Sequence, residues 1–172
     1  DKNILDLLED KTDRRVAFIY SALNEMQQKL IKLGASLEVY YGTPLEIFNS
    51  LLNKYRVEQV FTNHDYEPYA LEREKVITQL LESHQARLVT FKDQVIFEKN
   101  EVIKDDGTPY TIFTPYSRKW KATLLEDHLK PFDTQKYFNH FFQQAPFAIP
   151  SLQSMGFIEV EKSFPSKSLD AE

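Results

Sequence analysis

The sequence predicts an α/β fold with a doubly wound parallel sheet, followed by an aromatic-rich linker with short helices. Over the first hundred residues, segments with helical spacing of apolar residues alternate with short runs rich in β-branched and aromatic residues. Aromatic residues then crowd into residues 110–164. This shift in composition predicts two zones, an α/β domain over residues 1–104 and a linker over residues 105–172.

The first long helix is predicted over residues 13–34. Asp13 suits the N-cap, because its carboxylate can accept a hydrogen bond from a free amide of the first turn. Gly34 can adopt the left-handed conformation that ends a helix. The apolar residues of this segment recur at three- and four-residue steps and form one stripe: Val16, Ile19, Tyr20, Leu23, Met26, Leu30 and Leu33.

Strands and helices then alternate. Residues 37–41 form a β-rich run, and residues 43–46 combine a capping box with proline at the first helical position, which predicts a second helix. Residues 57–62 and 87–91 predict two further strands, with a helix over residues 68–84 between them.

A sheet of three parallel strands would make a poor core, because parallel sheets need cover on both faces. The chain also opens with a loop and a helix, whereas a doubly wound domain opens with a strand. We therefore expect at least one more strand before Asp1. Without that strand, the exposed sheet edge is expected to pair with another copy of the chain.

The alternation ends after the third predicted strand. Residues 95–103 predict a hairpin or strap, and residues 105–107 predict a turn. Residues 117–129 predict a helix that ends before a Lys-Pro pair. Residues 137–147 hold five aromatic side chains, and exposing so many would be costly. We expect this tail to dock on the domain or on another part of the protein.

Composition excludes several classes of protein. The net charge of −5, from 21 basic and 26 acidic residues, argues against direct nucleic-acid binding by this chain. No apolar run is long enough to span a membrane, and the first residues do not form a secretory signal. The absence of cysteine excludes disulfides and favours the cytoplasm.

Ligands of open α/β sheets bind at the carboxyl ends of the strands. Residues 63–69 follow the second predicted strand and are rich in donors, acceptors and aromatic faces, which suits a planar heteroaromatic ligand. The alternative is a solvated loop in which Asp65 caps the next helix. The spacing of His64, Asp65 and Glu67 matches no familiar metal site, and no phosphate-binding glycine loop occurs. The residues alone therefore predict a binding domain without a recognisable active site.

Two segments carry a resemblance to a known family. Residues 63–74, NHDYEPYALERE, resemble the N-x-D-x-E-P-Y-x-x-x-R-[DE] segment of the DNA photolyase and cryptochrome family. Residues 109–120, PYTIFTPYSRKW, are similar to its P-Y-x-V-F-T-P-[FY]-x-x-x-W segment. Further matches occur in the same order along the chain, at residues 15–18, 42–44, 91–97 and 149–152.

The resemblance implies an N-terminal Rossmann-like domain that holds an antenna chromophore, then a linker, then a helical domain that binds FAD. In this family the antenna passes excitation to reduced FAD, which donates an electron to a pyrimidine dimer in DNA. We expect this chain to be the first part of such an enzyme, lacking its first two strands. FAD and damaged DNA would bind the helical domain, so we expect no catalytic residue here and no activity from this chain alone.

The resemblance also implies antenna residues. Members with a folate antenna have an Asn-Glu pair where this chain has Tyr69 and Ala70, which argues against folate. Members with a flavin or deazaflavin antenna use an aspartate after the second strand, an arginine on the first helix and an aspartate in the N-x-D segment. The matching residues and their neighbours here are Asp1, Arg15, Asp65, Glu67 and Ala70.

Several alternatives stay open. Arg15 could instead form a helix-surface ion pair with Asp13 or Glu9, and some family members bind no antenna. The same segments occur in cryptochrome-type photoreceptors without repair activity, and a nucleotide-binding α/β module unrelated to light is a further alternative. The linker aromatics are expected to pack the linker on the domain, with a turn at residues 114–115 before the helix: Tyr110, Phe113, Tyr116 and Trp120.

Overall fold

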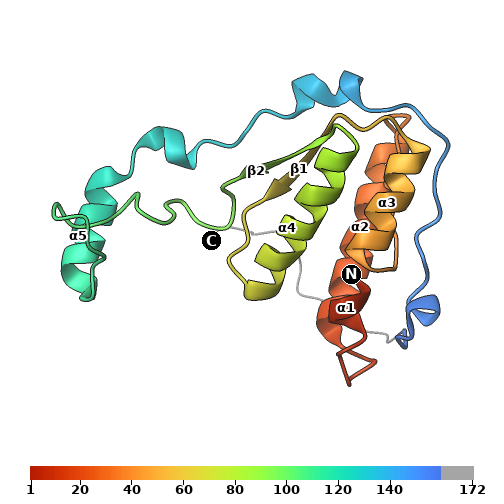
Figure 1. The fold of residues 1–172 in the computed structure, drawn as a ribbon, viewed down its shortest axis with the longest axis horizontal. Coiled ribbons are helices and arrows are strands. Elements are labelled where there is room, and N and C mark those ends of the chain that lie inside the picture. Colours follow the sequence, from red (N-terminus) through yellow and green to blue (C-terminus); the bar gives the residue numbers. More distant parts are fainter. Residues whose placement is uncertain (160–172) are drawn as a thin grey trace, which may run out of the picture. The chain divides into compact units, whose positions relative to one another are not determined.

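The computed structural model describes residues 1–159, and the chain divides into two units (Figure 1). The first unit contains Asp1–Ile47 together with residues 134–159, and the second contains Phe48–Asp133. Each unit has its own cluster of buried apolar residues. No helix within residues 1–159 is both long and apolar enough to cross a membrane.

The first unit is helical. Its core contains Val16, Leu152 and Phe157, so α2 and the end of the described chain bury apolar side chains together. Leu5, Leu8, Tyr20 and Met155 pack against this cluster. Its elements are α1 (Lys2–Leu5), α2 (Arg14–Ile31), the start of α3 (Pro44–Lys54), and the 3₁₀ helices η2 (Gln135–His140) and η3 (Gln153–Met155).

The helix predicted over residues 13–34 is confirmed as α2. The Asp13 carboxylate accepts a hydrogen bond from the Arg15 amide at 2.8 Å, as expected of an N-cap. Gly34 has φ +76°, the left-handed conformation expected just after the helix. Of the apolar stripe, Val16 is buried, whereas Ile19 and Met26 are exposed.

The strand predicted over residues 37–41 is absent from the structure. A strand forms through backbone hydrogen bonds to a neighbour. The Leu37 amide instead donates to Oε1 of the buried Gln27 side chain at 2.7 Å. Nε2 of Gln27 donates to Ser36 Oγ and to the Phe147 carbonyl at 2.8 and 2.7 Å. A buried side chain therefore satisfies backbone groups that a sheet would otherwise pair.

The tail docks on its own unit, as predicted, but largely through the backbone. The Gln144 amide donates to the Gly34 carbonyl at 3.1 Å, and the Phe147 amide donates to Ser36 Oγ at 2.9 Å. The Tyr137 and Phe142 side chains remain exposed. Aromatic burial therefore contributes less to this docking than the composition suggested.

The second unit contains the only sheet among the described residues, formed by β1 (Gln59–Asn63) and β2 (Arg87–Phe91). The strands are parallel, with Gln59 opposite Arg87 and Asn63 opposite Phe91. The connecting helix α4 (Pro68–Ser83) lies along them (Figure 1). These residues confirm the two later strands and a mixed α/β architecture. The core of this unit consists of Ile77, Leu81 and Ala86, packed against Phe48, Leu52, Val57, Val60 and Leu88.

The capping box predicted before α3 is present. Thr43 Oγ1 donates to Glu46 Oε2 at 2.6 Å, and the Thr43 amide donates to the same carboxylate at 3.3 Å. These hydrogen bonds lower the pKa of Glu46. Thr43 and Glu46 thus cap the start of α3, as the capping-box pattern predicted.

Beyond β2 the structure corrects two predictions. Residues 95–103 form no strand, so the predicted hairpin is wrong; they adopt bends and turns, which leaves the alternative of a strap, with the Glu101 amide donating to the Glu98 carbonyl at 3.0 Å. The helix predicted over residues 117–129 begins earlier, as α5 (Phe113–Thr123), and a separate 3₁₀ helix, η1 (Glu126–Leu129), follows. Pro115 lies in the first turn of α5, where amides have no partner within the helix, so proline does not prevent an early start.

Candidate functional site

The segment after β1 is held at the carboxyl end of the sheet. The His64 amide donates to the Phe91 carbonyl at 2.7 Å, which extends the pairing of the two strands by one bond. The Asn63 side-chain amide donates to Asp93 Oδ2 at 2.9 Å. Both contacts join the end of β1 to the end of β2, the edge where ligands of such sheets bind.

One carboxylate, Glu98, accepts hydrogen bonds from two residues of this loop. His64 Nδ1 lies 2.9 and 3.0 Å from its two oxygens, and the Tyr66 hydroxyl donates to Oε2. These bonds lower the pKa of Glu98, the Tyr66 bond contributing most, and raise the pKa of Tyr66 to about 12. The other ring nitrogen of His64, Nε2, lies 2.9 Å from Thr90 Oγ1, a hydroxyl that can donate or accept a hydrogen bond.

Asp65 lies between the two anchored residues. Its Oδ1 accepts a hydrogen bond from the Glu67 amide at 3.1 Å, a turn that precedes α4. The alternative in which Asp65 caps α4 is wrong, because Glu67 is the N-cap and Asp65 instead forms this turn just before the helix. Glu67 is exposed at the N-cap without a side-chain capping bond, and Ala70 is buried in the first turns of α4.

Asp1 and Arg15 belong to the first unit, whereas Asp65, Glu67 and Ala70 belong to the second. Asp1 is the N-cap of α1 and accepts from the Asn3 amide at 3.0 Å. The Arg15 side chain donates through Nε and Nη2 to Asp13, with Nη2 2.5 Å from Oδ2, and this pairing raises its pKa.

The Arg15 pair has the form expected of a helix-surface ion pair. The Arg15 side chain is still 76% exposed, so its guanidinium remains accessible from solvent.

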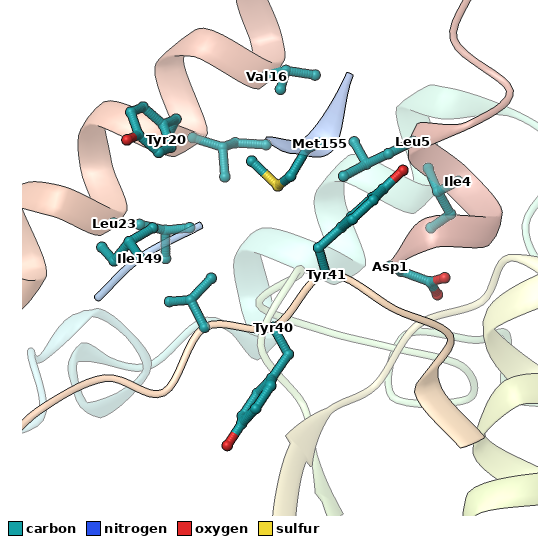
Figure 2. A pocket seen from close by; sticks show the side chains of 12 residues that line it. Asp1, Ile4, Leu5, Val16, Tyr20, Leu23, Tyr40, Tyr41, Ile149 and Met155 are labelled. Atoms are coloured by element: carbon teal, nitrogen blue, oxygen red, sulfur yellow. The ribbon is translucent and has the colours of Figure 1, made fainter. Parts of the chain in front are cut away.

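The first unit also contains a cavity of about 280 Å³ with mostly apolar walls (Figure 2). Leu5, Tyr41 and Met155 converge on it, with Asp1 at one side. The Tyr41 hydroxyl donates to the Asp6 carboxylate, which raises the pKa of Tyr41. The apolar stripe predicted for α2 already indicated which residues of this helix line the cavity. The lining residues from other parts of the chain belong to no sequence pattern that would have identified them.

No group of three or more His, Cys, Asp or Glu side chains within residues 1–159 has an arrangement that could hold a metal ion. The carboxylates and imidazole after β1 instead bond to one another, to hydroxyls and to amides. The chemistry available at this loop is hydrogen bonding to a polar ligand edge.

The two segments that carry the family resemblance lie on separate elements. Residues 63–74 form the end of β1, the anchored loop and the start of α4, and residues 109–120 lead into and form most of α5. The family model for DNA photolyase matches residues 4–136. The chain belongs to the DNA photolyase family. This match includes both segments, α2 and the two strands.

Named relatives agree with this family. The chain is 28% identical over 113 residues to a deoxyribodipyrimidine photo-lyase of Synechococcus sp., covering 66% of the chain and 23% of the relative. It is 26% identical over 160 residues to the enzyme of that name from Halobacterium salinarum, covering 93% and 33%. It is 21% identical over 153 residues to cryptochrome-2 of Gallus gallus, covering 83% and 26%. The chain thus spans a third or less of the length of these relatives.

The aromatic side chains of residues 110–120 in this photolyase-family chain differ in how they pack. The Trp120 and His128 rings meet Phe97 edge to face, with centroids 5.4 and 5.1 Å apart. Tyr110 contacts Tyr116. Phe113, in contrast, is 77% exposed, so it does not share the packing role expected of the segment.

Proposed function

We propose that the chain is the antenna-chromophore part of a deoxyribodipyrimidine photo-lyase, an enzyme that repairs pyrimidine dimers in DNA with light and FAD. The match of the photolyase family model to residues 4–136 carries this proposal. Relatives named as deoxyribodipyrimidine photo-lyases, from Synechococcus sp. and Halobacterium salinarum, support it. The proposal retains a doubly wound Rossmann-like domain over residues 1–104 and a linker over residues 105–172.

FAD and damaged DNA are proposed to bind the helical domain that follows the linker in this family. We assign no catalytic residue and no FAD contact to this chain, and its net charge of −5 agrees with DNA contact elsewhere. We expect the chain alone to be inactive, and we propose a cytoplasmic location for the intact protein.

The proposed antenna is a flavin or deazaflavin rather than a folate, held by Asp1, Arg15 and Asp65, with Glu67 and Ala70 nearby. The donor set fits the polar edge of an isoalloxazine-like ring, where carboxylates accept from ring N–H groups and a guanidinium donates to ring carbonyls. Asp13 accepts hydrogen bonds from Nε and Nη2 of Arg15 and not from Nη1. The Nη1 group of the guanidinium can therefore donate to a second acceptor. When bound, the antenna would absorb light and pass the excitation on.

Absorption spectroscopy and a repair assay on the purified full-length protein test the proposal. We expect bound flavin, a second chromophore and light-dependent loss of dimers from irradiated DNA. Absence of any flavin would contradict every light-driven function and favour a nucleotide-binding module unrelated to light.

A cryptochrome-type photoreceptor is the second candidate, because the chain also resembles cryptochrome-2 of Gallus gallus. Bound flavin without repair under light would favour it. The proposed self-association through the sheet edge is tested separately on the chain itself, by small-angle scattering over a concentration series. A mass equal to one chain at every concentration would contradict it.

A further inference from the structure

The loop after β1 is anchored on both sides of Asp65 to the same carboxylate. We propose that Glu98 is a positioning residue for the antenna site: it holds His64 and Tyr66 and thereby directs the Asp65 side chain toward the chromophore. This inference rests on the proposed function, because it concerns the same site. Nothing in the family motifs of residues 63–74 or 109–120 includes Glu98.

The geometry around Glu98 is restrictive. Its side chain is 12% exposed, and that of His64 is 24% exposed. His64 is fixed at three points, by Glu98, by the Thr90 hydroxyl and by its own amide on the Phe91 carbonyl. Tyr66 is fixed at its hydroxyl by Glu98. Both anchors restrain the chain on either side of Asp65, and we infer that the direction of the Asp65 side chain depends on them.

Glu98 is itself held from β2. Its amide donates to Glu101 Oε2 at 2.6 Å, and the Glu101 carboxylate accepts from Lys92 Nζ at 2.8 Å. Lys92 follows directly after β2. The anchor is therefore connected to the sheet and is not a freely moving loop residue.

Asp65 has acceptor capacity left for a ligand. Its Oδ1 accepts from the Glu67 amide, and within residues 1–159 its Oδ2 accepts no hydrogen bond. A hydrogen bond to a charged carboxylate contributes more to binding than one to a neutral acceptor. It does so only when the distance and angle of the bond are favourable. Glu98 would act by maintaining that geometry, without touching the chromophore.

The test is a double-mutant cycle in the full-length protein freed of its second chromophore, with flavin mononucleotide as the probe and binding followed by fluorescence. We expect Asp65→Ala to weaken binding about tenfold and Glu98→Gln about fivefold, since Asp65 is proposed to bond the flavin directly and Glu98 acts only by positioning Asp65. In the Asp65→Ala background, Glu98→Gln should change the dissociation constant less than about twofold, because it acts through Asp65.

Two further variants separate positioning from folding. Glu46→Gln makes the same chemical change at the capping box of α3, and it should reduce stability while leaving flavin affinity unchanged. Tyr66→Phe removes one of the two anchors and should weaken binding by an intermediate factor. Unfolding curves confirm that each variant is folded under the binding conditions.

Three results would overturn the inference. An equal effect of Glu98→Gln with and without Asp65 would show that it does not act through Asp65. An effect of Asp65→Ala without any effect of Glu98→Gln would remove the positioning role and leave the antenna site intact. No effect of Asp65→Ala would remove the proposed antenna contact itself, and with it the role of Glu98.

Discussion

The side-chain amide of Gln27 donates to the backbone carbonyl of Phe147 at 2.7 Å, across 120 positions of sequence. Gln27 is only 4% exposed, although it lies on a helix whose buried face was expected to be apolar. The side-chain oxygen of Gln27 accepts from the Leu37 amide, and its side-chain nitrogen donates to Ser36 Oγ and to the Phe147 carbonyl. This residue thus joins α2, the segment after it and the tail.

Replacing Gln27 by alanine is expected to destabilise the chain. The change removes the hydrogen bonds that Gln27 makes with the Leu37 amide and the Phe147 carbonyl, each of which contributes about 0.5–1.5 kcal/mol. Denaturant unfolding would measure the loss. The neighbouring Gln28→Ala is the control, because Gln28 is exposed. Equal stability of the two variants would contradict a structural role for Gln27.

Gly34 is predicted to tolerate alanine less well than Gly107 does. Both have positive φ, +76° and +81°, so both substitutions incur backbone strain of about 1–2 kcal/mol. A Cβ at Gly34 would lie 2.0 Å from Gln143 Oε1, whereas a Cβ at Gly107 would meet nothing within 4 Å. Gly34→Ala should therefore also disturb the Gln143 bond to the Leu33 carbonyl. Comparing the two melting temperatures tests this, and a smaller effect at Gly34 would refute it.

The antenna assignment predicts chromophore loss in two single variants of the full-length protein. Asp65→Ala and Arg15→Ala should each lower occupancy by a flavin-type second chromophore, by a factor of about ten in affinity. The ratio of second-chromophore to FAD absorbance measures this. Asp133→Ala and Arg14→Ala are matched controls at exposed positions. Unchanged occupancy in both test variants would refute the assignment.

Stability is predicted to fall in acid partly through Glu98. Hydrogen bonds from Tyr66 and His64 lower its pKa in the folded chain below the unfolded value. Its contribution is therefore present above the unfolded pKa and is lost as the pH falls through the folded pKa. The stability difference between the native sequence and Glu98→Gln should shrink below about pH 4, near the ordinary glutamate pKa.

Unfolding titrations at several pH values would measure this difference. Glu126→Gln, at an exposed position of η1, serves as the control and should show a smaller dependence on pH. A constant difference between the native sequence and Glu98→Gln from neutral to acid pH would contradict the linkage.

Elements with local signals were predictable. The Asp13 cap, the Thr43 and Glu46 box, and the apolar spacing between them located α2 and α3, and the β-rich runs located β1 and β2 to within two residues. The run at residues 37–41 carried a similar strand signal, yet its Leu37 amide bonds a side chain. Propensity describes which backbone conformation suits a residue. It does not supply the neighbouring strand that a ladder requires.

The sequence alone determined the family, because the segments at residues 63–74 and 109–120 are specific in residue type, spacing and order. It also placed Asp65 at the carboxyl end of a strand. Only the tertiary structure revealed that Glu98, 34 positions from His64, holds the loop around Asp65, and that Gln27 holds the tail. Capping and periodicity act within a turn or two of chain. Hydrogen bonds between residues far apart in sequence depend on the tertiary fold of the chain, and no local sequence pattern predicts them.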